Sequence, residues 1–212
     1  MVEDRVIPNL KLRFMQALAI GFLVIYLGVT CARWFSLDSL SAYAEYGFEV
    51  IFGGLILALY PRWEWRKNAL TLSACVALFF SLAAGLAIFE ATSILGYAVP
   101  FSFKDPETVL FLLVIGPLLE EWIFRGALWK LLQVITGSNL FSYLSCAVLF
   151  AYAHYQVIGQ IDPQYAGFVR YQAIYTLGLG LFCGGMRMQY GWRAAWLTHI
   201  AFNFGFWLGA LL

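Results

Sequence analysis

The chain alternates between long apolar stretches and short polar connections. Seven stretches approach or exceed the length of about 20 residues that a membrane-spanning helix needs. They cover roughly residues 14–32, 44–61, 69–89, 107–130, 140–158, 171–187 and 193–212. The pattern therefore predicts an all-α fold, a polytopic bundle of about seven transmembrane helices that forms a single membrane-embedded domain over residues 1–212.

Composition agrees with a membrane location. Of the 212 residues, 62% are hydrophobic and only 12% are charged, which is too little polar surface to cover a water-soluble globule. The net charge is +1 and no basic run occurs, so nucleic acid is not expected as a partner. The first apolar stretch is longer than the apolar core of a signal peptide, about 7–15 residues, and we expect it to be an uncleaved first helix.

The distribution of Lys and Arg predicts an orientation in the membrane, because these residues are enriched in cytoplasmic connections. With a cytoplasmic N-terminus, the cytoplasmic side holds Arg5, Lys11, Arg13, Arg62, Arg66, Lys67, Lys130, Arg187 and Arg193. The outer side then holds only Arg33, Lys104 and Arg170. We therefore expect a multi-pass protein with its C-terminus outside, in a bacterial inner membrane.

The apolar stretch 107–130 contains three ionisable side chains: Glu120, Glu121 and Arg125. Each costs at least about 2.5–3.5 kcal/mol to place in hydrocarbon, so three in one span indicate a functional site. Glu121 and Arg125 are four residues apart and can pair on one helix face. Glu120 is rotated by about 100° from Glu121 and faces a different neighbour, so its charge lacks that partner.

Both histidines of the chain, His154 and His199, lie in other apolar stretches. Phe150 precedes His154 by one turn, and Asn203 follows His199 by one turn on the same face. Isolated histidines in such helices commonly bind backbone carbonyls. A carboxylate, two imidazoles and an amide together are what hydrolysis of an amide requires, namely a base, groups that hold a water, and donors to the oxyanion.

Three spaced motifs can be read from these residues. They are Glu120 and Glu121 followed after three residues by Arg125 and Gly126, Phe150 three residues before His154, and His199 three residues before Asn203. The set resembles the motifs of the CPBP (CAAX protease and bacteriocin-processing, or Abi) family of intramembrane proteases, which includes type II CAAX prenyl endopeptidases. The resemblance covers about residues 109–206, and it implies a catalytic core over about 107–212.

The resemblance implies a role for each residue. Glu120 would activate the attacking water with help from His154, and His199 and Asn203 would stabilise the oxyanion. Glu121 would brace the first motif together with Arg125, and Phe150 would wall the pocket. The implied substrate is a membrane-associated protein or peptide within the lipid bilayer. The expected catalytic set is Glu120, Glu121, His154, His199 and Asn203, supported by Arg125 and Phe150.

Metal dependence stays open at this point. Two histidines and one glutamate, His154, His199 and Glu120, are a plausible zinc ligand set, and the same groups can also work without metal as a glutamic-type protease. We favour catalysis that does not depend on a metal.

Two other functions remain as alternatives. A sorting-type protease or transpeptidase that acts on C-terminal membrane anchors would need a nucleophile, for which Cys146 is the nearest candidate. Acids and histidines in membranes also form proton or ion relays without proteolysis. We expect Cys146 to be a packing residue.

Two expectations concern geometry. Gly178, Gly180, Gly184 and Gly185 should allow a neighbouring helix to approach closely. Counting about 1.5 Å per residue from the expected boundaries places Glu120 and His199 nearer the cytoplasmic side than His154. Since the three groups should meet, either the fifth helix begins at a different depth or a boundary is wrong.

Overall fold

The computed structural model describes residues 50–51, 53–54, 71–156 and 161–212. The chain divides into two compact units, Met1–Arg62 and Trp63–Leu212, and the fold below is that of the second unit. The expected span 14–32, nearly all of 44–61, and the connections before residue 71 that carry most of the charge bias lie outside the described residues.

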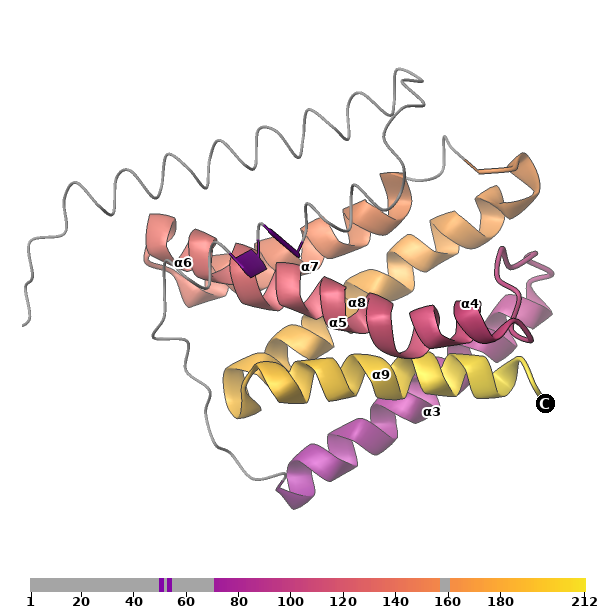
Figure 1. The fold of residues 1–212 in the computed structure, drawn as a ribbon, viewed down its shortest axis with the longest axis horizontal. Coiled ribbons are helices and arrows are strands. Elements are labelled where there is room, and N and C mark those ends of the chain that lie inside the picture. The colour runs from indigo at the N-terminus through magenta and orange to yellow at the C-terminus, as the bar shows by residue number, and fades with distance from the viewer. Residues whose placement is uncertain (1–49, 52, 55–70, 157–160) are drawn as a thin grey trace, which may run out of the picture. The chain divides into compact units, whose positions relative to one another are not determined.

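Every regular element in the described part of the chain is a helix, as the sequence predicts (Figure 1). A single helical run, residues 106–136, alternates between α-helical and π-helical segments. In chain order the elements are α3 (Leu72–Ile94), α4 (Pro106–Leu110), π-helical η1 (Phe111–Ile115), α5 (Gly116–Glu120), π-helical η2 (Glu121–Leu128), α6 (Trp129–Thr136), α7 (Asn139–Tyr155), the 3₁₀ turn η4 (Pro163–Tyr165), α8 (Ala166–Tyr190) and α9 (Trp192–Gly209).

Asp105 caps the start of the 106–136 run. Its Oδ2 accepts bonds from the Thr108 hydroxyl at 2.6 Å and from the Thr108 backbone N–H at 3.0 Å. These bonds stabilise the charged carboxylate and hold the pKa of Asp105 below its ordinary value. Pro106 follows at the first helical position, where its missing N–H costs no hydrogen bond. Local sequence therefore fixes where the motif-bearing helix begins.

The run ends at Gly137, beyond the expected boundary at residue 130. Gly137 adopts a left-handed conformation (φ 69°), which glycine tolerates without steric cost. Ser138 then caps α7 by accepting a bond from the Phe141 N–H at 3.1 Å. Glu120 and His154 are equally far along the chain from Gly137, so the antiparallel α6–α7 connection brings them to the same level. The boundary at 130 was therefore the error behind the expected difference in depth between Glu120 and His154.

Helix α9 is the central element, because it contacts α3, α8, α5 and both π-helical segments (Figure 1). Its crossing with α3 depends on glycine. A Cβ atom on Gly85 would overlap the Phe202 carbonyl oxygen, and one on Gly205 would overlap the Leu82 carbonyl oxygen. The Ser81 hydroxyl also donates to the Thr198 carbonyl at 2.7 Å. Close backbone approach therefore fixes the helix that carries His199 against α3.

The glycines of α8 divide into two groups. A Cβ on Gly180 would lie 3.2 Å from the Ala147 Cα, and one on Gly184 would lie 2.7 Å from the Tyr143 ring. These two glycines pack against α7, as expected. A Cβ on Gly178 or on Gly185 would meet no described atom within 4 Å, so these two glycines do not serve close packing against the part of the chain that the structure describes.

We predict that Gly205→Val destabilises the protein by at least about 1–3 kcal/mol, the usual cost of overpacking. The new side chain would meet backbone atoms of α3, which cannot rotate away as a side chain can. Thermal unfolding of the detergent-solubilised full chain would measure the effect. Gly178→Val is the matched control in α8, and an equal loss of stability in both variants would contradict close packing at Gly205.

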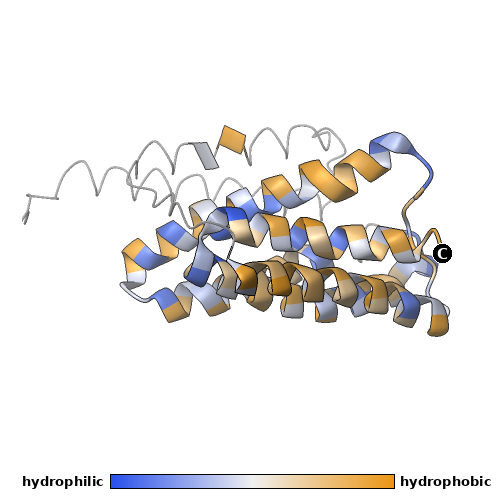
Figure 2. Ribbon diagram, turned by 90° about the horizontal axis from the view of Figure 1, so that it is seen from below, coloured by the Kyte–Doolittle hydropathy of each residue, from blue (hydrophilic) through white to orange (hydrophobic). Residues whose placement is uncertain are grey.

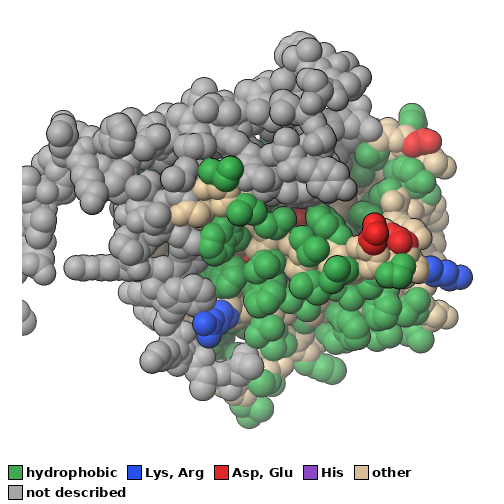
Figure 3. All heavy atoms as spheres, in the orientation of Figure 1, with side chains coloured by type: hydrophobic (Ala, Val, Ile, Leu, Met, Phe, Trp, Pro, Cys, Tyr) green, Lys and Arg blue, Asp and Glu red, His purple; other side chains and the backbone are tan. Residues whose placement is uncertain are grey.

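Hydrophobic residues recur along all the helices in Figure 2, and apolar side chains cover most of the described surface in Figure 3. Exposed examples on α3 are Leu72, Val76, Phe79 and Phe80. Judged by length and composition alone, α3 is the one helix in the described ranges that could cross a membrane.

Candidate active site

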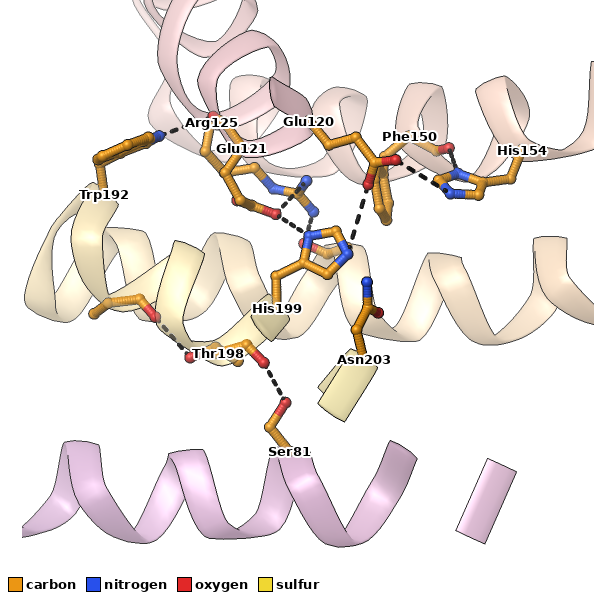
Figure 4. Close-up of polar contacts among 12 residues, drawn as sticks. Ser81, Glu120, Glu121, Arg125, Phe150, His154, Trp192, Thr198, His199 and Asn203 are labelled. Atoms are coloured by element: carbon orange, nitrogen blue, oxygen red, sulfur yellow. Dashed lines mark hydrogen bonds and ion pairs between the residues drawn. The ribbon is translucent and has the colours of Figure 1, made fainter. Parts of the chain in front are cut away.

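The side chains singled out by the sequence come from three helical regions. Glu120 closes α5 and Glu121 opens η2, while His154 lies near the end of α7 and His199 near the middle of α9. Figure 4 shows the Glu120 carboxylate directed toward both imidazoles. Residues more than 70 positions apart along the chain therefore meet in one cluster.

Glu121 and Arg125 form the ion pair that their spacing predicts. The Glu121 Oε1 and the Arg125 Nη1 are 3.0 Å apart, and both side chains are fully buried. The Arg125 Nη2 donates to the Gly180 carbonyl at 3.0 Å, and the guanidinium lies 4.5 Å from the centre of the Phe150 ring. The pair is thus enclosed by α8 and α7, where loss of either charge would leave the other unpaired.

His199 contacts both carboxylates. Its Nδ1 is 3.0 Å from the Glu121 Oε1, and its Nε2 is 3.5 Å from the Glu120 Oε2. An ionised carboxylate only accepts hydrogen bonds, so Nδ1 is the donor toward Glu121. The Glu121 bond therefore sets the plane of the ring and directs Nε2 toward Glu120. Sequence spacing did not reveal this contact, because it assigned Glu121 to Arg125 alone.

His154 approaches Glu120 from the opposite helix. Its Nε2 is 3.8 Å from the Glu120 Oε1, while its Nδ1 is 2.9 Å from the Phe150 carbonyl. A carbonyl only accepts, so Nδ1 carries a proton and, in the neutral ring, Nε2 presents a lone pair toward Glu120. The Phe150 ring packs against both imidazoles, at 4.7 Å from His154 and 5.6 Å from His199 between centroids.

The two carboxylates differ in their access to solvent. Glu121 is fully buried, whereas 32% of the Glu120 side chain is exposed. The distances of 3.5 and 3.8 Å from Glu120 to the two histidines exceed direct hydrogen-bond length. Glu120 is consequently the carboxylate that a water and a substrate can reach.

Asn203 lies one turn beyond His199 on α9, and Figure 4 shows its amide on the same side of the helix as the His199 ring. Its Nδ2 donates to the Leu112 carbonyl in η1 at 2.7 Å. An amide nitrogen carries two hydrogens, so one donor is still available.

Sequence reasoning also missed Trp192, whose Nε1 donates to the Glu121 carbonyl at 3.0 Å. A tryptophan near a predicted helix end is ordinarily interpreted as an interfacial residue, and its sequence position carries no signal for this bond.

The described residues form neither a zinc site nor a site in which Cys146 could act as a nucleophile. Among the residues that the structure describes, no group of three His, Cys, Asp or Glu side chains is arranged as a metal ligand set. Cys146 is buried in a core with Leu128 and Trp129, where a substrate has no access. Its expected packing role matches this position.

Comparison with known proteins gives one match. Residues 103–205 match the family model described as type II CAAX prenyl endopeptidase Rce1-like. No curated protein and no solved structure matched the chain. The matched segment runs from the residues before α4 to Gly205 in α9, and it contains all three motifs. Over this segment the chain is similar to the Rce1-like family of type II CAAX prenyl endopeptidases, a family of integral membrane proteases, and the match agrees with the resemblance of the three motifs to the CPBP (Abi) family.

Proposed function

We propose that the chain is an intramembrane endopeptidase that hydrolyses a peptide bond of a membrane-associated protein or peptide, with Glu120 as the general base. One observation carries this proposal. Within the family segment, Glu120 is a partly exposed carboxylate with an imidazole nitrogen of His154 and one of His199 within 3.8 Å. A base placed between two such groups can take a proton from a water that they orient.

The proposed reaction begins with a water held between Glu120 and the Nε2 of His154. Glu120 accepts one proton as the water oxygen attacks the carbonyl carbon of the substrate. The carbonyl oxygen becomes an oxyanion, and donors already in place stabilise it at little reorganisation cost. When the intermediate collapses, the C–N bond breaks and Glu120 returns its proton to the leaving amine. The products are a new amine and a new carboxylic acid, which releases its remaining proton to become a carboxylate.

His199 and Asn203 are the proposed oxyanion donors. The Nδ1 of His199 already donates to Glu121, so its Nε2 can donate only when the ring is doubly protonated. Glu121 would then hold the doubly protonated ring in place through its bond with Nδ1. Asn203 would donate the side-chain N–H that is not bonded to the Leu112 carbonyl. In this scheme Glu121 orients the His199 ring, and Arg125 holds Glu121 in place through their ion pair.

The placement in the membrane is part of the proposal. The chain would cross the membrane about seven times as one membrane-embedded domain, with its catalytic core over about 107–212. The charge bias of the connections supports a cytoplasmic N-terminus and an outer C-terminus, and a bacterial inner membrane is the proposed location.

We predict that cleavage continues after treatment with EDTA or another zinc chelator. The mechanism assigns base and oxyanion roles to side chains alone, and the described residues offer no metal ligand set. The measurement is cleavage by the purified full chain before and after chelation. Loss of cleavage that added zinc restores would assign His154, His199 and Glu120 to a metal instead.

The proposed function is tested by comparing the termini of membrane proteins between cells with the wild-type chain and cells with Glu120→Gln. Termini that only wild-type cells produce identify substrates. Repeating the cleavage in water labelled with oxygen-18 distinguishes the reaction types, since hydrolysis places the label in the new carboxylate and transpeptidation to an amine does not. An unchanged set of termini would refute an endopeptidase, and unlabelled products joined to a new amine would favour a sorting enzyme.

A further inference from the structure

The backbone around the two carboxylates is unusual. A π-helical segment shifts each carbonyl's partner from the fourth to the fifth following N–H, and such segments are rare and often occur at functional sites. The Gly116 N–H, for instance, bonds to the carbonyl of Phe111, five residues earlier. Where an α-helix passes into a π-helix, a carbonyl can lose its intrahelical donor. The direction of Glu120 and Glu121 therefore depends on what holds this backbone.

Side chains from neighbouring helices bind three carbonyls of the π-helical segments. Asn203 donates to Leu112 in η1, while Trp192 and Arg187 donate to Glu121 and Arg125 in η2. The contact at Glu121 is the most consequential, because the same residue holds Arg125 and orients His199. We propose that Trp192 is a positioning residue that fixes Glu121, and through it the His199 ring, for the reaction. This inference rests on the proposed function.

Helix α9 holds Glu121 at two points. The Trp192 indole binds the backbone carbonyl, and His199, two turns further along the same helix face, binds the carboxylate. Two bonds from one rigid helix fix both the position and the direction of the side chain. With only the carboxylate bond, α9 would no longer hold the backbone of η2 at Glu121, and the carboxylate could shift relative to His199. Trp192 thereby links the backbone of the first motif to the helix that carries the third.

The Trp192 indole is itself held in place. Gly191, with φ 89° and ψ 175°, forms the one-residue connection between α8 and α9, a conformation open essentially only to glycine. The Trp192 ring stacks on Trp196, with centroids 5.9 Å apart and an angle of 18° between the rings, and it is largely buried. These contacts direct the indole N–H at the Glu121 carbonyl.

The test compares Trp192→Phe with Trp196→Phe. Both changes remove an indole from the same stacked pair on α9, but the Trp196 N–H has no hydrogen-bond partner among the described residues. The full chain in detergent, labelled with nitrogen-15 at histidine, contains only two histidines, and a His154→Gln sample assigns their signals. The readouts are the His199 Nδ1–H resonance and, with a peptide taken from an identified substrate, kcat and KM.

We expect Trp192→Phe to shift or broaden the His199 resonance and to lower kcat about ten- to a hundredfold with little change in KM, because small misplacements of catalytic groups cost factors of this size. Trp196→Phe retains an aromatic ring that can stack on Trp192 and leaves the Trp192 indole N–H in place, so it should keep both values near those of the wild type. An unchanged His199 resonance in Trp192→Phe, or equal losses in the two variants, would overturn the positioning role. If the wild-type chain cleaves nothing, the proposed function fails, and the resonance alone still decides whether Trp192 positions His199.

Discussion

Glu120→Gln is expected to lower the cleavage rate about 10²–10⁴-fold while the protein still folds and inserts. Glutamine keeps the size of the side chain but cannot accept a proton from water. The partly exposed Glu120 makes no ion pair with Arg or Lys in the described contacts, so its neutralisation leaves no cation stranded. The measurement is turnover of an identified substrate by purified protein, alongside the yield of monodisperse protein in detergent.

Glu90→Gln is the matched control, because Glu90 is an exposed carboxylate on α3 away from the cluster. The control should cleave at the wild-type rate. Normal cleavage by Glu120→Gln would remove the general base from the mechanism. Loss of folded Glu120→Gln protein would instead assign Glu120 to stability, which its exposure argues against.

Sequence spacing predicted the parts of the site that local geometry determines. Glu121 and Arg125 pair because residues four apart face each other in a helix, and this alignment survives in the wider π-helical turn. Placing His154 and His199 beside Glu120 relied on the family resemblance, since no periodicity within one helix specifies which other helix it meets. The second contact of Glu121, with His199, could not be predicted from spacing. One carboxylate oxygen can accept from two donors, so the pairing with Arg125 did not indicate a further partner.

The helix ends and the π-helical segments were less accessible to prediction. Gly137 is a common type of helix C-cap, and Ser138 is a common type of N-cap for the next helix. The sequence prediction followed the apolar residues alone and therefore ended the fourth span at residue 130. No characteristic amino-acid composition marks the π-helical segments in the sequence. They are held by side chains of other helices, as the Leu112 carbonyl is held by the Asn203 amide. The α3–α9 crossing likewise depends on Gly85 and Gly205, whose partners lie far away in sequence.

Arg125→Met is expected to reduce the amount of folded protein sharply, with a loss of about 3–5 kcal/mol in the free energy of unfolding. The change strands the fully buried Glu121 without its cation and also removes the bond from Arg125 to the Gly180 carbonyl. Methionine retains much of the apolar volume against Phe150, so lost packing contributes little. The measurement is the yield of monodisperse protein together with its thermal unfolding in detergent.

Arg170→Met is the matched control, since Arg170 is exposed at the start of α8, and its stability should equal that of the wild type. A double variant, Glu121→Gln with Arg125→Met, separates charge from structure. Replacing both charges leaves no buried unpaired ion, so we expect the double variant to recover most of the folded protein. It should remain inactive, because His199 then loses the carboxylate that orients its ring. If Arg125→Met accumulates normally yet is inactive, Arg125 serves the reaction directly and does not brace Glu121.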